Sequence, residues 1–326
     1  MKTYLLAVII SALLTVFFGF ILIPVLKRLK VGQPILKYVS EHKAKSGTAT
    51  MGGILFVFSA IATYFIFSNG KSRLINLTVA ITLGFLVIGF LDDFLKIKLK
   101  HNEGLTPAQK FTFQIVISLI ASYFAFDTGL NFIYLPFTDI KLKLGVFVIP
   151  LSAIVFLATV NSVNLTDGLD GLCGSVSIVV FLALAVIIVL QAKVFPSYIN
   201  DSEYKSISLF CVCMAGALLG YLVFNTNKAS VFMGDTGSLA IGGALSTVAT
   251  LSGNVLYIPI IGVFYLISTL SVIIQVIKFK RTGKRVFLMA PLHHHFQEKG
   301  HSESKIAYTY SFITLIISLL CILVYI

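Results

Sequence analysis

Residues 161–172 read Asn-Ser-Val-Asn-Leu-Thr-Asp-Gly-Leu-Asp-Gly-Leu, and long apolar runs stand on both sides of them. The stretch holds two asparagines and two aspartates in a chain that is 57% hydrophobic and only 12% charged. Polar groups set against hydrocarbon are costly, so this concentration needs a reason. We expect a polar loop at a membrane surface that takes part in binding or catalysis.

The apolar runs define the fold class. About 20 apolar residues cross a bilayer as one helix, and the 326 residues contain ten segments of roughly this length. We predict an all-α integral membrane protein, a single polytopic domain over residues 1–326. The first run lacks the small-residue cleavage pattern of a signal peptide and should remain as a span. The expected spans are 4–26, 51–69, 74–91, 109–127, 144–162, 175–193, 206–224, 237–252, 254–277 and 305–325.

Lysine and arginine set the expected orientation. Of the 25 basic residues, 18 fall in the loops on one side of the ten spans, namely 27–50, 92–110, 163–174, 225–236 and 278–305. The positive-inside rule makes that side cytoplasmic and places both termini outside. The net charge of +12 also suits anionic headgroups and an anionic substrate.

Two other features are expected to be structural. Alternating apolar residues over 131–145 predict a short exterior β-hairpin that turns near residues 138–139. The four cysteines form no disulfide framework, so we expect reduced packing residues.

Further polar clusters are expected on the cytoplasmic side. Asp92 and Asp93 end the third span, and adjacent carboxylates repel one another unless a cation or a proton is shared. Asp93 and Lys96 are three residues apart and can pair on one helix face. Asp235 stands between glycines where the eighth span begins. It looks too isolated for a surface ion pair, which favours a metal ligand or a helix N-cap.

Within the central stretch, Asn161 and Asn164 share a helix face, and an amide oxygen is a fair ligand for a hard metal ion. Asp167 and Asp170 face one way only if the helix continues, whereas the glycine after each favours a loop. A calcium-binding EF-hand is excluded, because its alternating oxygen ligands and closing glutamate are missing.

The last cytoplasmic loop carries His293, His294 and His295. Consecutive side chains fan about 100° apart on a helix and do not form the i, i+4 pair of a zinc site. Imidazole nitrogens can instead donate to phosphate oxygens. We expect Gln275, near the end of the ninth span, to border the same cavity.

Two more residues could contact a nucleotide. Lys45 precedes a glycine-rich helix entry and could meet a phosphate or a base edge. Phe232 could stack on a planar base, or simply anchor the chain at the membrane interface.

Together these motifs resemble the polyprenyl-phosphate N-acetylhexosamine-1-phosphate transferase superfamily. The resemblance rests on Asp-Asp-Phe-Leu-Lys at 92–96, the stretch 161–172, the segment 225–235 with Phe-Met-Gly-Asp at its end, and Pro-Leu-His-His-His-Phe at 291–296. That histidine motif and Thr-Met-Gly-Gly at 50–53 are similar to the phospho-MurNAc-pentapeptide translocase branch. The branch that uses UDP-GlcNAc has a different histidine motif. Gln297, where the branch often has glutamate, is a minor departure.

The resemblance implies that phospho-MurNAc-pentapeptide passes from UDP-MurNAc-pentapeptide to undecaprenyl phosphate, giving lipid I and UMP with Mg²⁺. It implies a homodimer in the bacterial cytoplasmic membrane, acting on the cytoplasmic face and without nucleic acid. The UDP-GlcNAc reaction is the alternative, and direct transfer and a phosphoryl-aspartate intermediate both stay open. A transporter is disfavoured, because the acidic residues lie at span ends on one face.

The resemblance also implies residue roles. Asp235 and Asn164 would hold the metal ion. The catalytic group would be Asp92, Asp93, Lys96, Asp235, His294 and His295. The substrate contacts would be Lys45, Thr50, Asn164, Leu165, Asp167, Gly168, Asp170, Asn225, Phe232, Gln275 and His293.

Overall fold

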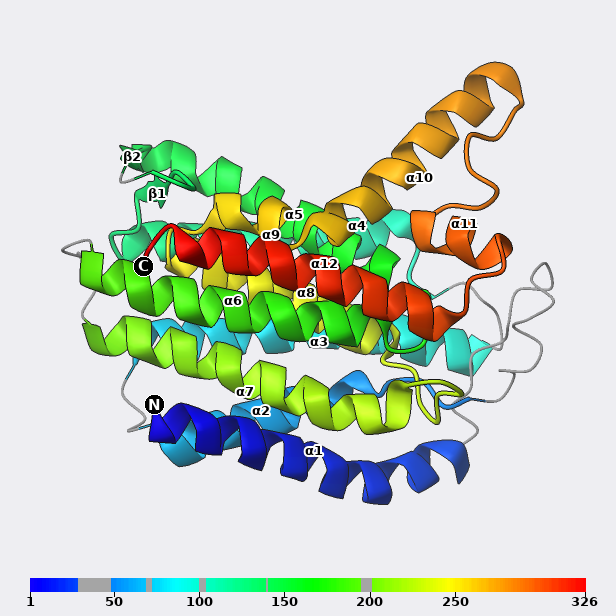
Figure 1. Ribbon diagram of the computed structural model, residues 1–326, viewed down its shortest axis with the longest axis horizontal. Helices are drawn as coiled ribbons and strands as arrows, with labels where there is room; N and C mark the ends of the chain where they lie inside the picture. Colours follow the sequence, from blue (N-terminus) through cyan, green and yellow to red (C-terminus); the bar gives the residue numbers. More distant parts are fainter. Residues whose placement is uncertain (29–47, 69–71, 100–103, 139, 195–200) are drawn as a thin grey trace.

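The computed structural model describes residues 1–28, 48–68, 72–99, 104–138, 140–194 and 201–326, and most of them are helical (Figure 1). The helices are α1 (Lys2–Arg28), α2 (Gly53–Phe67), α3 (Arg73–Leu99), α4 (Pro107–Asp127), α5 (Val148–Thr166), α6 (Leu172–Val194), α7 (Asp201–Asn225), α8 (Gly234–Leu251), α9 (Ile258–Ile261), α10 (Val263–Thr282), α11 (Leu292–Glu298) and α12 (Glu303–Leu323). Short 3₁₀ turns stand at Gly145–Phe147 and Val255–Tyr257.

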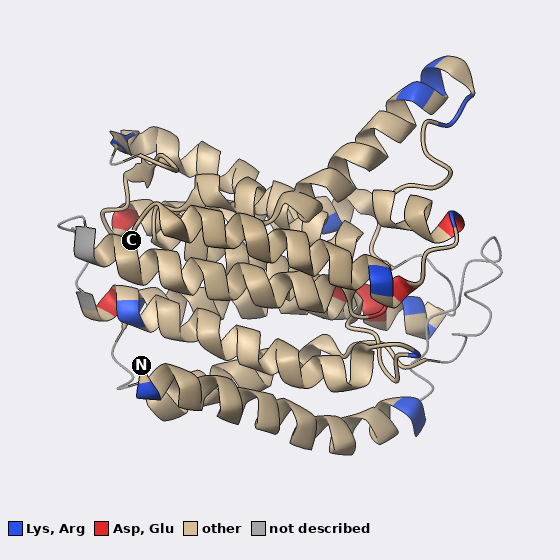
Figure 2. Ribbon diagram, in the orientation of Figure 1, with Lys and Arg blue, Asp and Glu red and all other residues tan. Residues whose placement is uncertain are grey.

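The long helices run side by side as one bundle. Both termini lie at one end of it and α11 at the other (Figure 1). Charged residues gather at these two ends and at the tip of α10, while long uncharged stretches lie between (Figure 2). Among the described residues, 8 helices are long and apolar enough to cross a membrane. The prediction of an all-α integral membrane protein is confirmed, and its orientation stays a prediction.

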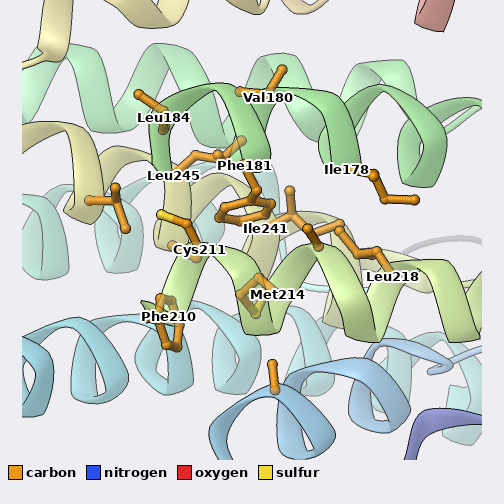
Figure 3. Close-up of a cluster of buried hydrophobic side chains, with 14 of the residues drawn as sticks. Ile178, Val180, Phe181, Leu184, Phe210, Cys211, Met214, Leu218, Ile241 and Leu245 are labelled. Carbon is orange, nitrogen blue, oxygen red and sulfur yellow. The ribbon is translucent and has the colours of Figure 1, made fainter. Parts of the chain in front are cut away.

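Helix α8 forms the centre of the bundle. Nearly all of its residues are buried, and it packs on α2, α3, α5 and α6. Figure 3 shows Phe181 of α6, Met214 of α7 and Ile241 of α8 meeting in one apolar cluster. Because lipid tails are as apolar as these side chains, close packing rather than removal from water holds such helices together.

Protein rather than lipid surrounds α8, which explains its composition. It is not among the 8 strongly apolar helices and contains many glycines and hydroxyl residues. The hydroxyls of Ser238 and Thr247 donate to the carbonyls four residues earlier, at 3.0 and 2.7 Å. Some hydroxyls of α8 therefore bond within the helix, and because protein surrounds it, the helix needs no lipid-facing apolar side chains.

Several of the ten predicted spans differ from the structure. The second and eighth correspond to α2 and α8, which are not among the 8 helices long and apolar enough to cross a membrane. The fifth was expected to end at residue 162, but α5 continues to Thr166. The third was expected to stop at residue 91, but α3 continues to Leu99, because the polar side chains of its last two turns bond to protein. The ninth was expected as one helix over 254–277. It is divided at Gly262 into α9 and α10, and α10 leaves the bundle at an angle (Figure 1).

The strand pairing of the predicted hairpin and the prediction for the cysteines are confirmed, while the exterior position of the hairpin stays a prediction. Strands β1 (Phe132–Tyr134) and β2 (Lys141–Lys143) pair antiparallel, with Ile133 opposite Leu142. The turn prediction includes residue 139, which lies outside the described residues. All four cysteines are free and buried.

The predicted orientation can be tested by labelling. Lys2 and Lys284 are exposed, and Figures 1 and 2 place the N-terminus and the basic tip of α10 at different ends. With a membrane-impermeant maleimide, Lys2→Cys should react in intact cells and Lys284→Cys only after permeabilisation. The native cysteines give little background because they are buried. The reverse labelling pattern would invert the topology.

Candidate active site

Asp92 and Asp93 are neighbours in α3 but contact different partners. Asp92 Oδ1 accepts a hydrogen bond from the Leu105 backbone N–H at 2.9 Å, and its Oδ2 lies 2.6 Å from Lys96 Nζ. The expected pair between Asp93 and Lys96 is therefore wrong. Lys96 pairs with the aspartate four residues earlier, because Asp93 is directed toward α8.

Asp93 caps the N-terminus of α8. Its Oδ1 accepts the Asp235 N–H at 3.2 Å, and its Oδ2 accepts the N–H and the hydroxyl of Thr236 at 3.0 and 2.6 Å. The first N–H groups of a helix have no partner within it, and the helix dipole favours negative charge there. The N-cap residue, Met233, offers no side-chain acceptor. Asp235 was a candidate N-cap, but it lies inside the first turn.

Gly89 makes this contact possible. It lies one turn before Asp93 on α3, where a Cβ would be only 2.1 Å from the Asp235 carbonyl oxygen. Any larger residue would push α8 away from α3. The approach of the two helices therefore depends on this glycine.

Asp235 is the meeting point of three helices. Its Oδ2 lies 3.1 Å from Lys96 Nζ of α3 and 2.7 Å from Lys110 Nζ of α4. Its Oδ1 accepts Asn164 Nδ2 of α5 at 2.7 Å, and the same amide nitrogen contacts Ser238 Oγ at 2.8 Å. The expectation that Asp235 is too isolated for an ion pair is wrong, because both lysines come from helices far away in the sequence.

Asp167 follows α5 as its C-cap residue and borders the cavity described below. Burial raises the pKa of this carboxyl well above its usual range, and the charges of Asp235, Asp93 and Asp170 raise it further. Asp167 therefore gives up its proton less readily than an exposed aspartate.

Asp170 and Asn225 hold two loops together. Asp170 Oδ2 accepts the Ala229 N–H at 3.0 Å, and the Asp170 N–H donates to Glu303 Oε2 at 2.8 Å. Asn225 Oδ1 accepts the Gly171 N–H at 3.1 Å, and its Nδ2 donates to a carbonyl in the loop that leads to α8. The central stretch is thereby tied to the loop between α7 and α8 and to the start of α12.

The entry to α2 pairs with the same loop. Ala49 forms a parallel bridge with Val231, and the Phe232 N–H donates to the Ala49 carbonyl at 2.8 Å. Thr50, within this segment, is buried, and its hydroxyl has no hydrogen-bond partner among the described residues. The predicted contact of Lys45 lies outside the described residues.

The three histidines of α11 have different environments, although the rings of His293 and His294 lie side by side, with centroids 4.5 Å apart. His294 borders the cavity, and its Nδ1 lies 2.9 Å from Gln297 Oε1. His295 Nδ1 accepts the Leu288 N–H at 3.1 Å, so this side chain holds the preceding loop. His293 is fully buried, and burial, with His294 beside it, lowers its pKa to about 3.

Gly168 lets α11 approach the central stretch. A Cβ there would lie 2.3 Å from His293 Nε2 and 2.9 Å from His294 Nε2. Neither ring nitrogen of His293 has a partner in the described part of the chain. His293 therefore packs behind the loop as a neutral ring, and of the three histidines only His294 borders the cavity.

A cavity of about 280 Å³ lies where these elements meet. Eight of the predicted residues line it. They are Asn164, Asp167, Gly168, Asp170, Asn225, Phe232, Asp235 and His294. Leu165 is not part of this lining, and neither is Gln275.

The place predicted for Gln275 needs correction. Its Oε1 accepts the N–H groups of Val286 and Phe287 at 2.9 and 3.0 Å, and its Nε2 donates to the Phe287 carbonyl at 3.1 Å. It borders a separate cleft of about 720 Å³ beside α10. The loop after α10 turns back along the helix, and the Gln275 amide holds it there through these hydrogen bonds.

The site has the donor set of a hard divalent cation. Asp92, Asp93 and Asp235 each offer a carboxylate oxygen, and these atoms lie within 4.8 Å of one another. Such oxygens suit Mg²⁺. Asp93 is committed to α8, and Asn164 contacts Asp235 through Nδ2, an atom that cannot bind a cation. Asp92 Oδ2 and Asp235 Oδ2 are paired with lysine side chains rather than with the backbone of α8, so these two carboxylates are the better placed to accept a cation.

Two residues of the site were not predicted. Lys110 lies in the first turn of α4, where the helix dipole disfavours a cation. This unfavourable position is the one sequence feature that could have indicated a functional lysine. Glu303 starts α12 and suits its dipole, so nothing in the sequence distinguishes it from an ordinary first-turn glutamate.

Comparison with known proteins matches residues 74–253 to the family described as glycosyl transferase family 4. A phospho-N-acetylmuramoyl-pentapeptide-transferase of Clostridium perfringens is 43% identical over 311 residues, which cover 95% of this chain and 93% of the relative. Proteins of the same name from Clostridium botulinum and Geobacillus sp. are 43% and 42% identical, each over 97% of this chain and 95% of the relative.

The chain belongs to the phospho-N-acetylmuramoyl-pentapeptide-transferase family. It is an enzyme of the transferase class. The part matched by glycosyl transferase family 4 contains Asp92, Asp93, Lys110, Asn164 and Asp235, while the histidines of α11 lie beyond it.

Asp93→Asn should destabilise this transferase, because the new amide nitrogen would face the N–H groups of α8, from which it cannot accept. An unsatisfied buried group costs about 1–3 kcal/mol. Asp92→Asn is the matched control, since it keeps an acceptor for Leu105 and leaves Lys96 paired with Asp235. Thermal unfolding in detergent should show the larger loss for Asp93→Asn, and equal losses would contradict the capping role.

His293 should make stability depend on pH. In the unfolded chain histidine titrates near ~6.5, whereas in the folded chain burial lowers the pKa of His293 to about 3. Below pH ~6.5 only the unfolded state gains this proton, so stability falls as pH drops toward 3, by about 2 kcal/mol at pH 5. Between pH 7.5 and 5, the unfolding temperature of His293→Gln should fall less than that of the wild type. An identical fall would exclude His293 as the cause.

Proposed function

We propose that this transferase moves phospho-MurNAc-pentapeptide from UDP-MurNAc-pentapeptide to undecaprenyl phosphate, giving lipid I and UMP at the cytoplasmic face of the bacterial membrane. The supporting observation is Asp235 in the first turn of α8, which meets a lysine from the last turn of α3 and another from the first turn of α4. Cations beside carboxylates, where helices end, suit a reaction between phosphates on a lipid and on a soluble nucleotide.

The reaction exchanges one phosphorus–oxygen bond for another. An oxygen of the lipid phosphate attacks the phosphorus that carries the sugar, and the bond from that phosphorus to the bridging oxygen breaks. UMP leaves with the bridging oxygen and its electron pair. No redox partner is needed, so the protein's task is to position the groups and stabilise their charge.

The two lysines would stabilise the charge of the phosphates. Lys96 and Lys110 both contact Asp235 Oδ2 and are mostly buried, where electrostatic interactions are stronger than in water. Asn164 orients Asp235 from the other side. When bound, Mg²⁺ would be held by Asp235 with Asp92 and would lower the repulsion between the phosphates and the leaving UMP.

Asp92 has little need to act as a base. The second pKa of a phosphomonoester is near ~6, so the lipid phosphate is mostly dianionic at neutral pH. Asp92 is also engaged with Lys96 and the Leu105 N–H. We infer that Asp92 positions Lys96 and repels misplaced phosphate oxygens.

The uridine would bind on the other side of the cavity. Phe232 presents an aromatic ring, and Asp170 and Asn225 supply polar groups beside it. A cavity of about 840 Å³ also includes Asp170 and is lined by polar residues such as Lys228 and Glu303. The two cavities together give a large substrate more room than the first alone.

Purified protein with Mg²⁺ and undecaprenyl phosphate should release UMP from UDP-MurNAc-pentapeptide and much more slowly from UDP-GlcNAc. The histidine motif and the names of the relatives favour this order. UMP release is measured by coupled assay, with a reaction lacking the lipid as control. Release from UDP-GlcNAc alone would establish the sister reaction instead.

A further inference from the structure

A hydrogen bond between two amides joins α4 to α5 next to the site. Asn161 Nδ2 of α5 donates to Gln114 Oε1 of α4 at 2.8 Å, and also to the Leu157 carbonyl of its own helix at 2.8 Å. Gln114 lies seven residues into α4, about 10 Å from the start of that helix. The bond therefore lies within the span, away from the loops.

Gln114 occupies a position where a polar side chain is costly. It is fully buried, and its Nε2 has no hydrogen-bond partner among the described residues. A buried amide with an unused donor destabilises the fold, so its presence indicates another role. An apolar side chain of similar length would pack there at lower cost.

The rest of the α4 surface against α5 specifies register poorly. The buried residues that follow Gln114 on this face are small, namely Ser118, Ala121, Ser122 and Ala125. The hydroxyls of Ser118 and Ser122 have no partner in the described part of the chain. Within the described residues, the bond from Gln114 to Asn161 is the one side-chain hydrogen bond between these helices. Small residues allow close contact, but none of these four described residues makes a side-chain hydrogen bond to α5 that would fix one register.

Both partners stand one turn from residues that contact Asp235. Lys110 precedes Gln114 by four residues on one face of α4, and Asn164 follows Asn161 by three on one face of α5. Lys110 Nζ and Asn164 Nδ2 reach different oxygens of Asp235, each at 2.7 Å. A shift of α4 by a fraction of a turn would take Lys110 out of reach.

We propose that Gln114 is a positioning residue. Through Asn161 it fixes the register of α4 against α5, so that Lys110 and Asn164 meet at Asp235. Gln114 touches no substrate and acts through Lys110. An effect of Gln114 on kcat rests on the proposed function, whereas its structural coupling to Lys110 does not.

Gln114→Met keeps the length of the side chain and removes the bond. We expect kcat for UMP release to fall at least tenfold, while the affinity for UMP measured by calorimetry stays within twofold, because Asp170, Asn225 and Phe232 do not depend on α4. Ser118→Ala is the matched control, since it removes an unpartnered buried polar atom one turn away on α4. This control should keep the wild-type kcat.

A double-mutant cycle separates positioning from general damage. If Gln114 acts through Lys110, then Gln114→Met combined with Lys110→Gln should be no slower than Lys110→Gln alone, within twofold. The proposal would be overturned if the two losses of kcat multiply in the double variant, or if Gln114→Met keeps the wild-type kcat. If Gln114→Met does not fold, Asn161→Leu breaks the same bond from α5 and enters the same cycle.

Failure of the proposal for Gln114 can be distinguished from failure of the proposed function. If the wild type releases no UMP from either nucleotide sugar, the reaction is wrong, and the cycle is then measured on the unfolding temperature without substrate. Non-additive shifts for Gln114→Met and Lys110→Gln would support the coupling. Additive shifts would reject it.

Discussion

The site depends on the carboxylate of Asp93 at the first turn of α8. The first N–H groups of α8 have no partner within the helix, and Gly234 and Thr236 there are buried. Asp93 supplies both oxygens to this end from α3, and Gly89 allows the two helices to come close enough. Because Asp93 fixes the start of α8, it also fixes the position of Asp235. Side chains from α3, α4 and α5 then contact this residue.

Charge balance then explains the cations around Asp235. Three carboxylates within 4.8 Å of one another repel strongly where water is scarce. Lys96 and Lys110 offset two of these charges, and Lys96 bridges Asp92 and Asp235 directly. One negative charge remains in this group, which suits a bound divalent ion that also faces the phosphates. The same arrangement would be a poor purely structural element, since an apolar cluster of equal volume would stabilise the bundle at lower cost.

Simple spacing predicted the fold, and the family resemblance added most of the residues that the structure brings around the cavity. Apolar runs locate the helices, and alternation of the loops brings Asp92, Asn164, Asp170 and Asp235 to one end. Spacing does not predict which partner each side chain contacts at that end of the bundle. Asp93 and Lys96 have pairing geometry on an isolated helix, yet α8 takes Asp93 for its cap. Lys110 was missed because its partner lies on a helix 125 positions away. Gln275 was misplaced because the loop after α10 turns back and occupies its amide.

The two sides of the cavity are built differently, and this suggests a division of labour. Helices α3, α4, α5 and α8 hold the charged side, largely through bonds between side chains of different helices. Loops hold the side with Asp170 and Asn225, through bonds from side chains to backbone. Helix contacts fix distances between charged atoms more tightly than loops do, which phosphate chemistry requires. Loops adapt more readily to a base and its attachments. Rigidity is therefore concentrated where the reacting bonds would lie, and Gln114 contributes to it from within the membrane.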